Sequence, residues 1–583
     1  MRNTQSTLAR LSRAVGKKKA YILYLALLQA ALGLCSVISA LLFRNLIDRA
    51  VARDREGFLQ AVIWLLALMA GRLALNALGH FLYEWTRATL ENQFKEGLFS
   101  CLLRKSYASV TAVHSGEWMN RLTSDTAVVA SGIVEIVPGL TGLSIRLLGA
   151  LAAIFVLEPV FMGILIPGGG LVLLLTYCFR KVLKRLHKRI QEADGALRVF
   201  LQERLGSLMV VRAFAMEKET ERGAAEKMRL HKTARIRRNL LSNLCNTAFG
   251  AAANGIYLFG AAYCGWGILE GTVSYGTMTA MLQLIGQVQS PFANLTGYLP
   301  RYYAMIASAE RLMEAEAYEE DCAGETASSE EIRRFYREEF RGMGLENACF
   351  TYHASAQSPQ EPFAGADSAG RTVLDGMNLE IRKGEYVAFT GHSGCGKSTV
   401  LKLLMSLYSL DAGERYLLSA GPDGKEARQP LTARLRGLFA YVPQGNQLMS
   451  GSIREIVALG DSGRMKEEEA LWQSLRIACA EEFVRELEEG LDTVLGERGS
   501  GLSEGQMQRI AIARAIFSDR PVLMLDESTS ALDDGTERRL LSNLRAMTDR
   551  TVLIITHRPE ALRICDKRIA MREDGRNSLC DNR

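Results

Sequence analysis

Long stretches without a charged side chain constrain the fold of the first half of this chain. Spanning about 30 Å of hydrocarbon takes about 20 mostly apolar residues, because a helix rises about 1.5 Å per residue. Four segments pass this test without any Asp, Glu, Lys or Arg, and they are residues 20–43, 160–179, 240–269 and 271–300. Residues 58–83 and 136–157 also qualify if Arg72 and Arg146 face other helices or water. The sequence therefore predicts an all-α transmembrane domain of six helices.

The connections between these six segments predict which side of the membrane they face. Short links join the first segment to the second, the third to the fourth and the fifth to the sixth, whereas residues 84–135 and 180–239 are long and polar. The second long connection is rich in Lys and Arg, which marks the cytosolic side. We expect an integral, multi-pass protein of a bacterial cytoplasmic membrane, with both termini and the soluble domain in the cytosol.

Chain length and composition limit the number of domains and the classes of partner that are expected. A chain of 583 residues is too long for one core. The formal net charge of +6 lies mainly beside apolar segments, so we expect no nucleic-acid partner. The 11 cysteines are odd in number and form no CxxC pair, so the sequence indicates neither a disulfide framework nor a zinc site. The predicted parts are a basic cytosolic lead-in (1–19), a transmembrane domain (20–310), a charged linker (311–340) and a nucleotide-binding α/β domain (341–583).

A glycine-rich loop gives the first chemical signal in the soluble half. Residues 391–399 read GHSGCGKST, between a strand-like run and an apolar helix, which is the context that a phosphate-binding loop needs. Glycines let backbone amides close on phosphate oxygens at a helix N-terminus, where the dipole favours anions. We predict that ATP, with Mg²⁺, binds here through Gly391, Ser393, Gly394, Cys395, Gly396, Lys397, Ser398 and Thr399.

Two acids follow a second apolar run. Residues 521–525 read as a buried strand that ends in Asp526 and Glu527, as expected at the carboxyl edge of a parallel sheet. Asp526 and Ser398 suit magnesium, and Glu527 is placed to polarise the water that attacks the γ phosphate. An apolar run followed by two acids is more often a simple strand end. Its position about 130 residues after a phosphate loop favours the functional interpretation.

Several further motifs resemble one family. LSEGQ at 502–506, followed by RIAIARA at 509–515, is similar to the signature of ATP-binding cassette (ABC) proteins, and YVPQ at 441–444, SALD at 530–533 and THR at 556–558 match as well. Six spans ahead of one cassette resemble an exporter-type half-transporter over nearly the whole chain. The resemblance implies an ATP hydrolase coupled to transport across the membrane. Residues 121–125 and 210–217 look like cytosolic coupling segments of that family.

The resemblance also implies roles for single residues. Gln444 would sense the γ phosphate and contribute to the magnesium site, and His557 would contact the γ phosphate beside the catalytic Glu527. Tyr352 would stack on adenine, although residues 353–370 form an insertion longer than the usual loop of the family.

A single cassette implies a partner chain, because in this family one cassette's signature closes over the nucleotide of another. The residues facing that partner would be Ser503, Gly505 and Gln506 of the signature and Asp533 of the dimer loop. Glu504 departs from the glycine that is usual in the family and puts a carboxylate near the partner's phosphates. No other motif is degraded, so a homodimer and a heterodimer are equally open.

The cargo is less defined by the sequence. Gln283, Gln287 and Asn294 share one face of the last span. The resemblance implies that they line the cavity, because the family uses that helix in this way. The expected function is export of an amphipathic small molecule, lipid or peptide by alternating access. Membrane lipid is an expected partner of the helices. Two alternatives stay open: an exporter-shaped importer of a metal chelate, and an ATP-gated membrane regulator or channel.

Overall fold

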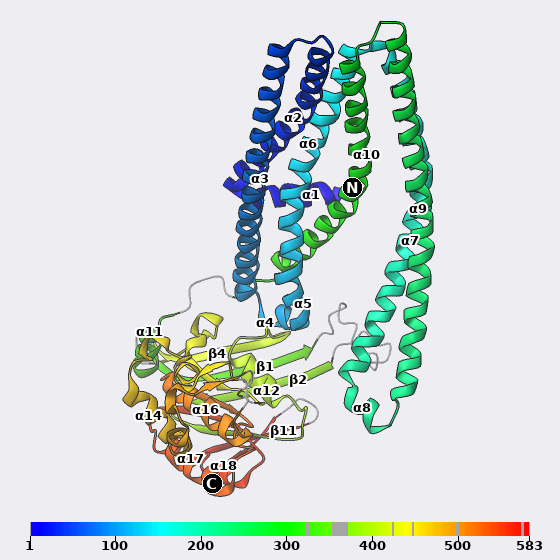
Figure 1. Ribbon diagram of the computed structural model, residues 1–583. Helices are drawn as coiled ribbons and strands as arrows, with labels where there is room; N and C mark the ends of the chain where they lie inside the picture. The colour runs from blue at the N-terminus through cyan, green and yellow to red at the C-terminus, as the bar shows by residue number, and fades with distance from the viewer. Residues whose placement is uncertain are drawn as a thin grey trace. The chain divides into compact units, whose positions relative to one another are not determined.

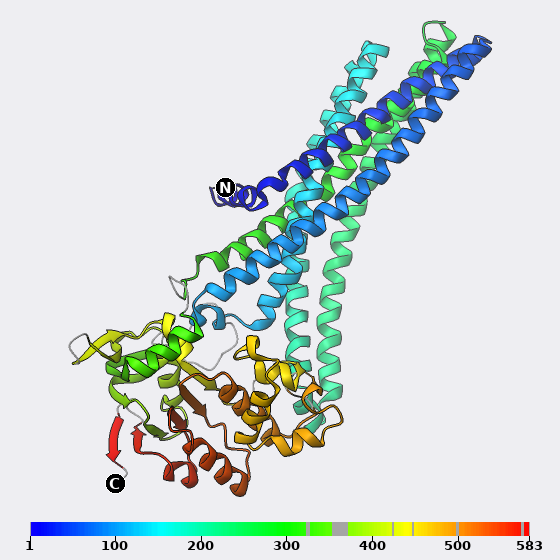
Figure 2. The same ribbon diagram turned by 90° about the vertical axis from the view of Figure 1, so that its left-hand side faces the viewer.

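The chain folds into two compact units. The computed structural model describes residues 2–321, 327–352, 371–421, 425–445, 448–496, 499, 501–572 and 577–581. One unit comprises Met1–Gly97 and Asn120–Met313, and the other comprises Leu98–Met119 and Glu314–Arg583. The insertion predicted at 353–370 lies outside the described residues. The first unit is helical and the second combines sheets with shorter helices (Figures 1 and 2).

Long helices make up the first unit. They are α1 (Arg2–Val15), α2 (Lys19–Val51), α3 (Arg55–Arg104), α6 (Thr126–Leu157), α7 (Pro159–Gly206), α8 (Leu208–Ala213), α9 (Glu217–Leu269) and α10 (Tyr275–Glu314). α3 has 50 residues and a length of about 75 Å, more than twice the hydrocarbon thickness. In the part of the chain that the structure describes, three segments are apolar and long enough to cross a membrane: Thr7–Val51, Arg55–Arg104 and Ser115–Leu157. The count of six spans stays a prediction.

Glycines bring α2 and α6 into backbone contact. A Cβ at Gly33 would lie 2.8 Å from the carbonyl oxygen of Gly142, and a Cβ at Gly142 would lie 3.0 Å from that of Gln29. Small residues at such crossings allow the close packing that membrane helices use in place of a hydrophobic driving force. Residues of α2, α6, α7, α9 and α10 meet in one buried cluster around Phe161 and Leu284.

α7 and α9 form a pair that runs side by side (Figures 1 and 2). Beyond the shared cluster around Phe161, many of the pair's apolar side chains are exposed, among them Val199, Leu205, Leu240 and Leu244. Helical membrane proteins bury such side chains against lipid or against other helices. The α7–α9 pair therefore has a surface that this single chain leaves uncovered.

The predicted coupling segment 121–125 forms a π-helical turn, η2 (Arg121–Asp125), inside the first unit. The Asp125 carboxylate is 3% exposed and accepts hydrogen bonds from Ser308 (2.8 Å) and from two nitrogens of Arg311 (2.8 and 2.6 Å). This bidentate pair ties the turn to α10. The other predicted coupling segment, 210–217, covers the end of α8 and the start of α9.

The second unit is built on two main sheets. Its helices are α4 (Tyr107–Thr111), α5 (Ser115–Asn120), α11 (Ser329–Glu338), α12 (Lys397–Leu404), α13 (Ile453–Ala458), α14 (Glu468–Ile477), α15 (Glu481–Glu486), α16 (Glu504–Phe517), α17 (Asp534–Arg545) and α18 (Pro559–Arg563). Its strands are β1 (Phe340–Tyr352), β2 (Arg371–Arg382), β3 (Tyr386–Thr390), β4 (Ala412–Ala420), β5 (Glu426–Pro430), β6 (Phe439–Val442), β7 (Gly451–Ser452), β8 (Val494–Leu495), β9 (Val522–Asp526), β10 (Thr551–Ile555), β11 (Lys567–Met571) and β12 (Asn577–Asp581).

The strand order defines the site-bearing sheet. The first sheet is antiparallel, with the order β2-β1-β4-β5, and the second has the order β12-β11-β3-β10-β9-β6. From β11 to β6 the strands of the second sheet run parallel. Both of its faces are buried, as the apolar runs predict for a parallel sheet.

Alternation along these strands divides the core in two. Val387, Met524 and Leu553 pack on the face covered by α12, whereas their neighbours Ala388 and Leu523 pack on the opposite face. The opposite face is covered by α13, α14, α16 and α17. A strand's side chains alternate between faces with a period of two, so Asp526 lies on the same face of β9 as Met524, the face covered by α12.

Residues 98–119 belong to the second unit, although the predicted transmembrane domain 20–310 includes them. The amide of Ser106 donates to the carbonyl of Glu319, and the amide of Asp321 donates to that of Arg104, each at 2.9 Å. Asp321 in turn forms a two-pronged ion pair with Arg436 at 2.6 and 3.0 Å. These bonds fix residues 98–119 to the sheets of the second unit.

Candidate nucleotide site

Four neighbouring strands place the predicted motifs along one sheet edge. β3, β10, β9 and β6 are adjacent and parallel, so their carboxyl ends open on the same side. The phosphate loop follows β3, His557 follows β10, Glu527 follows β9 and Gln444 follows β6. Ligands of open α/β sheets bind at such carboxyl edges. The sheet topology thus brings together motifs that lie far apart in the sequence.

The phosphate loop wraps around its own lysine. Gly391, Gly394 and Gly396 adopt φ of 143°, 82° and 100°, a region that favours glycine. Lys397, which is 5% exposed, donates its ammonium group to the carbonyl oxygens of Gly391 (2.7 Å) and His392 (2.8 Å). The lysine is therefore held at the N-terminus of α12, where the helix dipole favours an anion.

The other loop residues differ in exposure. Ser393 is exposed, and Cys395 is buried with its sulfur 3.9 Å from the Lys397 ammonium. Thr399 is buried at the first turn of α12, and its hydroxyl lies 3.2 Å from that of Tyr352. The structure therefore connects the predicted adenine-side tyrosine directly to the phosphate loop.

A hydroxyl and a carboxylate sit together where magnesium is predicted. Asp526 is 2% exposed and accepts the Ser398 hydroxyl at 2.9 Å through one oxygen and the Tyr441 hydroxyl at 2.9 Å through the other. Burial, together with the neighbouring Asp526 carboxylate, holds the pKa of Tyr441 far above its usual range, so the phenol keeps its proton at neutral pH and donates a hydrogen bond to Asp526. Magnesium prefers one or two carboxylate oxygens beside phosphate oxygens, and these residues fit that preference.

Glu527 occupies a strained backbone position. Its φ of 49° is uncommon for a residue with a side chain. Its amide donates to the carbonyl of Ile555 at 3.1 Å, and its carboxylate accepts the Gln444 amide at 2.6 Å. Strain of this kind persists where the surroundings over-determine it and concentrates at active sites. His557 lies exposed just beyond the end of the adjacent strand β10.

Aromatic rings cluster around Tyr352, the residue predicted to stack on adenine. Tyr352 makes edge contacts with Phe350 (4.8 Å between ring centroids) and with Tyr408 (5.5 Å), and Tyr408 makes one with Tyr107 of α4 (5.6 Å). No role for Tyr107, Tyr408 or Tyr441 follows from the sequence motifs, although Tyr441 is the first residue of the YVPQ motif. Strand alternation ahead of Gln444 could have indicated Tyr441, but no sequence pattern joins Tyr107 to Tyr408.

The signature segment is ordered by a cap, away from the phosphate loop. Ser503 and Gln506 form a capping box at the start of α16, with reciprocal bonds of 3.3 and 2.9 Å. Gly505 approaches the carbonyl of Ala531, to which a Cβ would lie 2.8 Å away. Asp533 caps α17 by accepting the amide of Thr536. Among the described residues, no hydrogen bond joins these side chains to the phosphate loop of the same chain.

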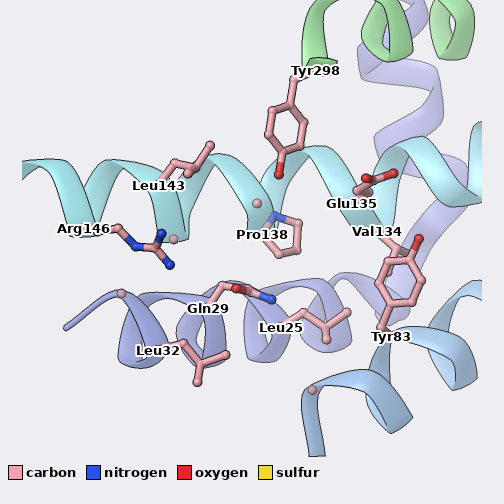
Figure 3. A pocket seen from close by; sticks show the side chains of 14 residues that line it. Leu25, Gln29, Leu32, Tyr83, Val134, Glu135, Pro138, Leu143, Arg146 and Tyr298 are labelled. Carbon is pink, nitrogen blue, oxygen red and sulfur yellow. The ribbon is translucent and has the colours of Figure 1, made fainter. Parts of the chain in front are cut away.

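A separate cavity of about 180 Å³ lies in the first unit, between α2, α3, α6 and α10. Figure 3 shows Gln29 and Arg146 between α2 and α6, with the Tyr298 hydroxyl directed toward α6. Its remaining lining residues are Leu25, Leu32, Gly33, Gly79, Tyr83, Val134, Glu135, Pro138, Gly139, Gly142 and Leu143.

The role of Gln283, Gln287 and Asn294 as lining of the transport cavity stays a prediction. Gln287 donates its amide to the carbonyl of Ser36 at 2.8 Å, which is an interhelical bond, and neither Gln283 nor Gln287 lines the cavity shown in Figure 3. The side chain of Asn294 lies outside the described residues. Arg146 does line the cavity, and its Nε is buried with no partner among the described atoms.

The fold and the sheet-edge motifs define a phosphate-loop ATPase that carries a helical membrane unit. Comparison with known protein families gives the same class of protein. The profile of the ABC transporter transmembrane region matches residues 22–292, and that of the ABC transporter ATPase domain matches residues 374–530. The chain therefore belongs to the ABC transporters of the exporter type, as a half-transporter with one nucleotide-binding domain, and it is an ATP-hydrolysing integral membrane protein.

Relatives match over most of the chain. An uncharacterized ABC transporter ATP-binding protein, YwjA of Bacillus subtilis, is 28% identical over 550 residues, covering 93% of this chain and 90% of its own. An ATP-dependent lipid A-core flippase of Syntrophus aciditrophicus is 29% identical over 478 residues, covering 81% and 74%. The solved structure of a bacterial Atm1-family ABC exporter with ATP bound shares the fold, with a TM-score of 0.75, 21% identity and coverage of 95% and 94%.

Proposed function

We propose that this chain is one half of an exporter that moves an amphipathic cargo, with a lipid as the cargo class, out of the cytosol of a bacterium. The observation that carries the proposal is the pairing of Ser398 with Asp526 and of Gln444 with Glu527, beside a phosphate loop, in a chain with membrane-spanning helices. The cassette lies on the cytosolic side in this proposal, because the positively charged connections flank it.

Each residue at the sheet edge has a proposed task. Lys397 releases the loop carbonyls and binds the β and γ phosphates, together with the loop amides. Ser398, Asp526 and Gln444 would hold magnesium, which neutralises charge on the phosphate oxygens. Glu527 polarises the attacking water, oriented by the amide of Gln444, and His557 contacts the γ phosphate.

The proposed site is completed by a second half-transporter. Ser503, Gly505 and Gln506 have no bond to their own phosphate loop among the described residues, and the exposed α7–α9 surface needs a partner. ATP between two cassettes supplies contacts to both faces, and hydrolysis removes the shared phosphate, so the cassettes close and reopen.

The ATPase activity of the purified chain tests which partner is used. Activity of the chain alone means that a second copy suffices. If the chain alone is inactive and a second, related chain restores the activity, the functional unit is a heterodimer. If the chain alone is active, mixing Lys397→Ala with Ser503→Arg tests the shared site. Each variant alone should be inactive, whereas mixed dimers contain one site with an intact loop and an intact signature. No recovery in mixed dimers would contradict a shared site.

The wall of the cavity suits one part of an amphipathic molecule, because a volume of about 180 Å³ is below the size of a site for a whole small ligand. Its wall is mostly apolar, and Arg146 brings a cationic group with an unpartnered Nε to it. Ionisable groups at membrane depth are costly and usually face a cavity or a partner. The lipid A-core flippase relatives act, by their names, on a lipid.

Transport into inverted membrane vesicles tests both direction and cargo. ATP-dependent accumulation of a fluorescent anionic phospholipid or detergent-like dye in such vesicles is expected, and Arg146→Ala should reduce accumulation several-fold while basal ATPase activity persists. Arg72→Ala, which removes the same charge from α3 outside the lining of this cavity, is the matched control. Depletion of the probe from the vesicles would indicate import, and ATP-gated leakage without accumulation would indicate a channel.

A further inference from the structure

The magnesium-binding acid has a second hydroxyl partner that no sequence motif assigns. Asp526 lies at the last position of β9, and β6 is its parallel neighbour, with Tyr441 opposite Met524 and Val442 opposite Leu525. Tyr441 and Met524 both belong to the core under α12. The period of two puts Asp526 on that same face, which lets the Tyr441 ring reach it.

The two oxygens of Asp526 are used differently. One accepts the hydroxyl of Ser398, the residue expected to bind the metal, and the other accepts Tyr441 at 2.9 Å. At 2% exposure this carboxylate has little water to fix its orientation, so the two hydroxyls do so. Partners of a metal-binding carboxylate set its direction and its basicity.

Residues at the end of β6 therefore form hydrogen bonds to both acids at the end of β9. Tyr441 bonds to Asp526, and three residues later Gln444 bonds to Glu527 at 2.6 Å. We propose that Tyr441 is a positioning residue that orients Asp526 toward magnesium, so that one strand end sets the directions of the metal-binding acid and the catalytic acid together. The inference rests on the proposed magnesium role of Asp526.

The test separates metal binding from nucleotide binding. The affinity of the full-length chain in detergent for the non-hydrolysable analogue AMP-PNP is measured twice, once with Mg²⁺ and once with EDTA. The gain in AMP-PNP affinity that Mg²⁺ gives should be about tenfold smaller in Tyr441→Phe than in the wild type, while the affinity in EDTA stays unchanged. A factor of about ten is the lower end of the usual loss in metal affinity when a metal ligand loses its hydrogen-bond partner. Tyr441→Leu, which also lacks the hydroxyl, is the second variant and should lose the same gain.

Tyr386→Phe is the matched control. Tyr386 is 2% exposed in the same sheet, but its hydroxyl donates to the carbonyl of Leu544, so the magnesium gain should stay as in the wild type. An unchanged gain in Tyr441→Phe, or an equal loss with Mg²⁺ and with EDTA, would overturn the inference. Asp526→Asn tests the proposed magnesium role of Asp526 separately. If Mg²⁺ still increases the AMP-PNP affinity of this variant as in the wild type, the proposed magnesium site itself is wrong.

Discussion

Arg558, the residue after His557, holds the dimer loop to the start of α17. Its guanidinium donates at 2.8 Å to the carbonyls of Ser530 and Leu532 and to the carboxylate of Glu537. The Glu537 side chain is 1% exposed, and its other oxygen accepts the Thr529 hydroxyl at 2.9 Å. Arg558 is 30% exposed, so the two members of this ion pair differ greatly in their access to water.

That difference predicts an asymmetric response to mutation. Arg558→Ala leaves a buried carboxylate with one neutral donor, and breaking a buried pair in this way costs about 3–5 kcal/mol. Glu537→Gln keeps an acceptor for Arg558 and leaves only a partly exposed cation, so we expect a cost of about 1 kcal/mol. At about 2–4 °C per kcal/mol, a loss of about 3 kcal/mol lowers the melting temperature of the cassette by roughly 6–12 °C.

Pulse proteolysis of the full-length chain in detergent, detected through a C-terminal tag, measures this melting. Arg563→Ala is the control, because Arg563 is 72% exposed in its pair with Glu560 and should change stability by less than about 1 kcal/mol. Removing both charges, in Arg558→Met with Glu537→Leu, should recover part of the loss. Equal destabilisation by Arg558→Ala and Glu537→Gln would refute the argument from the buried carboxylate.

Three further predictions concern the nucleotide site. Glu527→Gln should lower the hydrolysis rate by about 10²–10⁴ while ATP stays bound, and sustained hydrolysis in a filter-binding and phosphate-release assay would contradict its role as base. A maleimide should inhibit hydrolysis through Cys395, whose sulfur lies 3.9 Å from the Lys397 ammonium in the phosphate loop, with protection by ATP and resistance in Cys395→Ala. Full sensitivity of the alanine variant would exclude Cys395. Glu504→Gly should strengthen ATP-induced dimerisation severalfold in gel filtration, since it removes a carboxylate facing the partner's phosphates, and an unchanged dimer fraction would show that this charge is harmless.

Local signals in the sequence were sufficient for the nucleotide-binding half. The phosphate loop predicted a strand, a tight turn and a helix, and β3, Gly391–Gly396 and α12 confirm them. Its chemistry is confined to a few consecutive residues, so no long-range contact is needed to recognise it. The membership in the ABC transporters is confirmed by both family profiles.

Contacts between distant segments could not be predicted in the same way. The bond of Tyr441 to Asp526 depends on β6 lying beside β9, which follows from strand order and not from composition. Tyr107 reaches Tyr408 across about 300 residues, and neither side chain stands in a motif. In the membrane unit, the bond of Gln287 to the carbonyl of Ser36 could not be predicted, because a helix face does not reveal which neighbour it meets. The lining role that the family resemblance implies for Gln287 stays a prediction.

The assignment of residues 98–119 to the cassette unit has a consequence for synthesis of the chain. The ribosome releases this segment early, but Glu319 and Asp321, which bind it, come about 200 residues later, and Tyr408 comes about 300 residues later. At 5–20 residues per second, the segment waits on the order of 10–60 seconds for these partners. The cassette unit therefore cannot fold strictly in the order of translation, and residues 98–119 stay without these contacts until the later segments have been made.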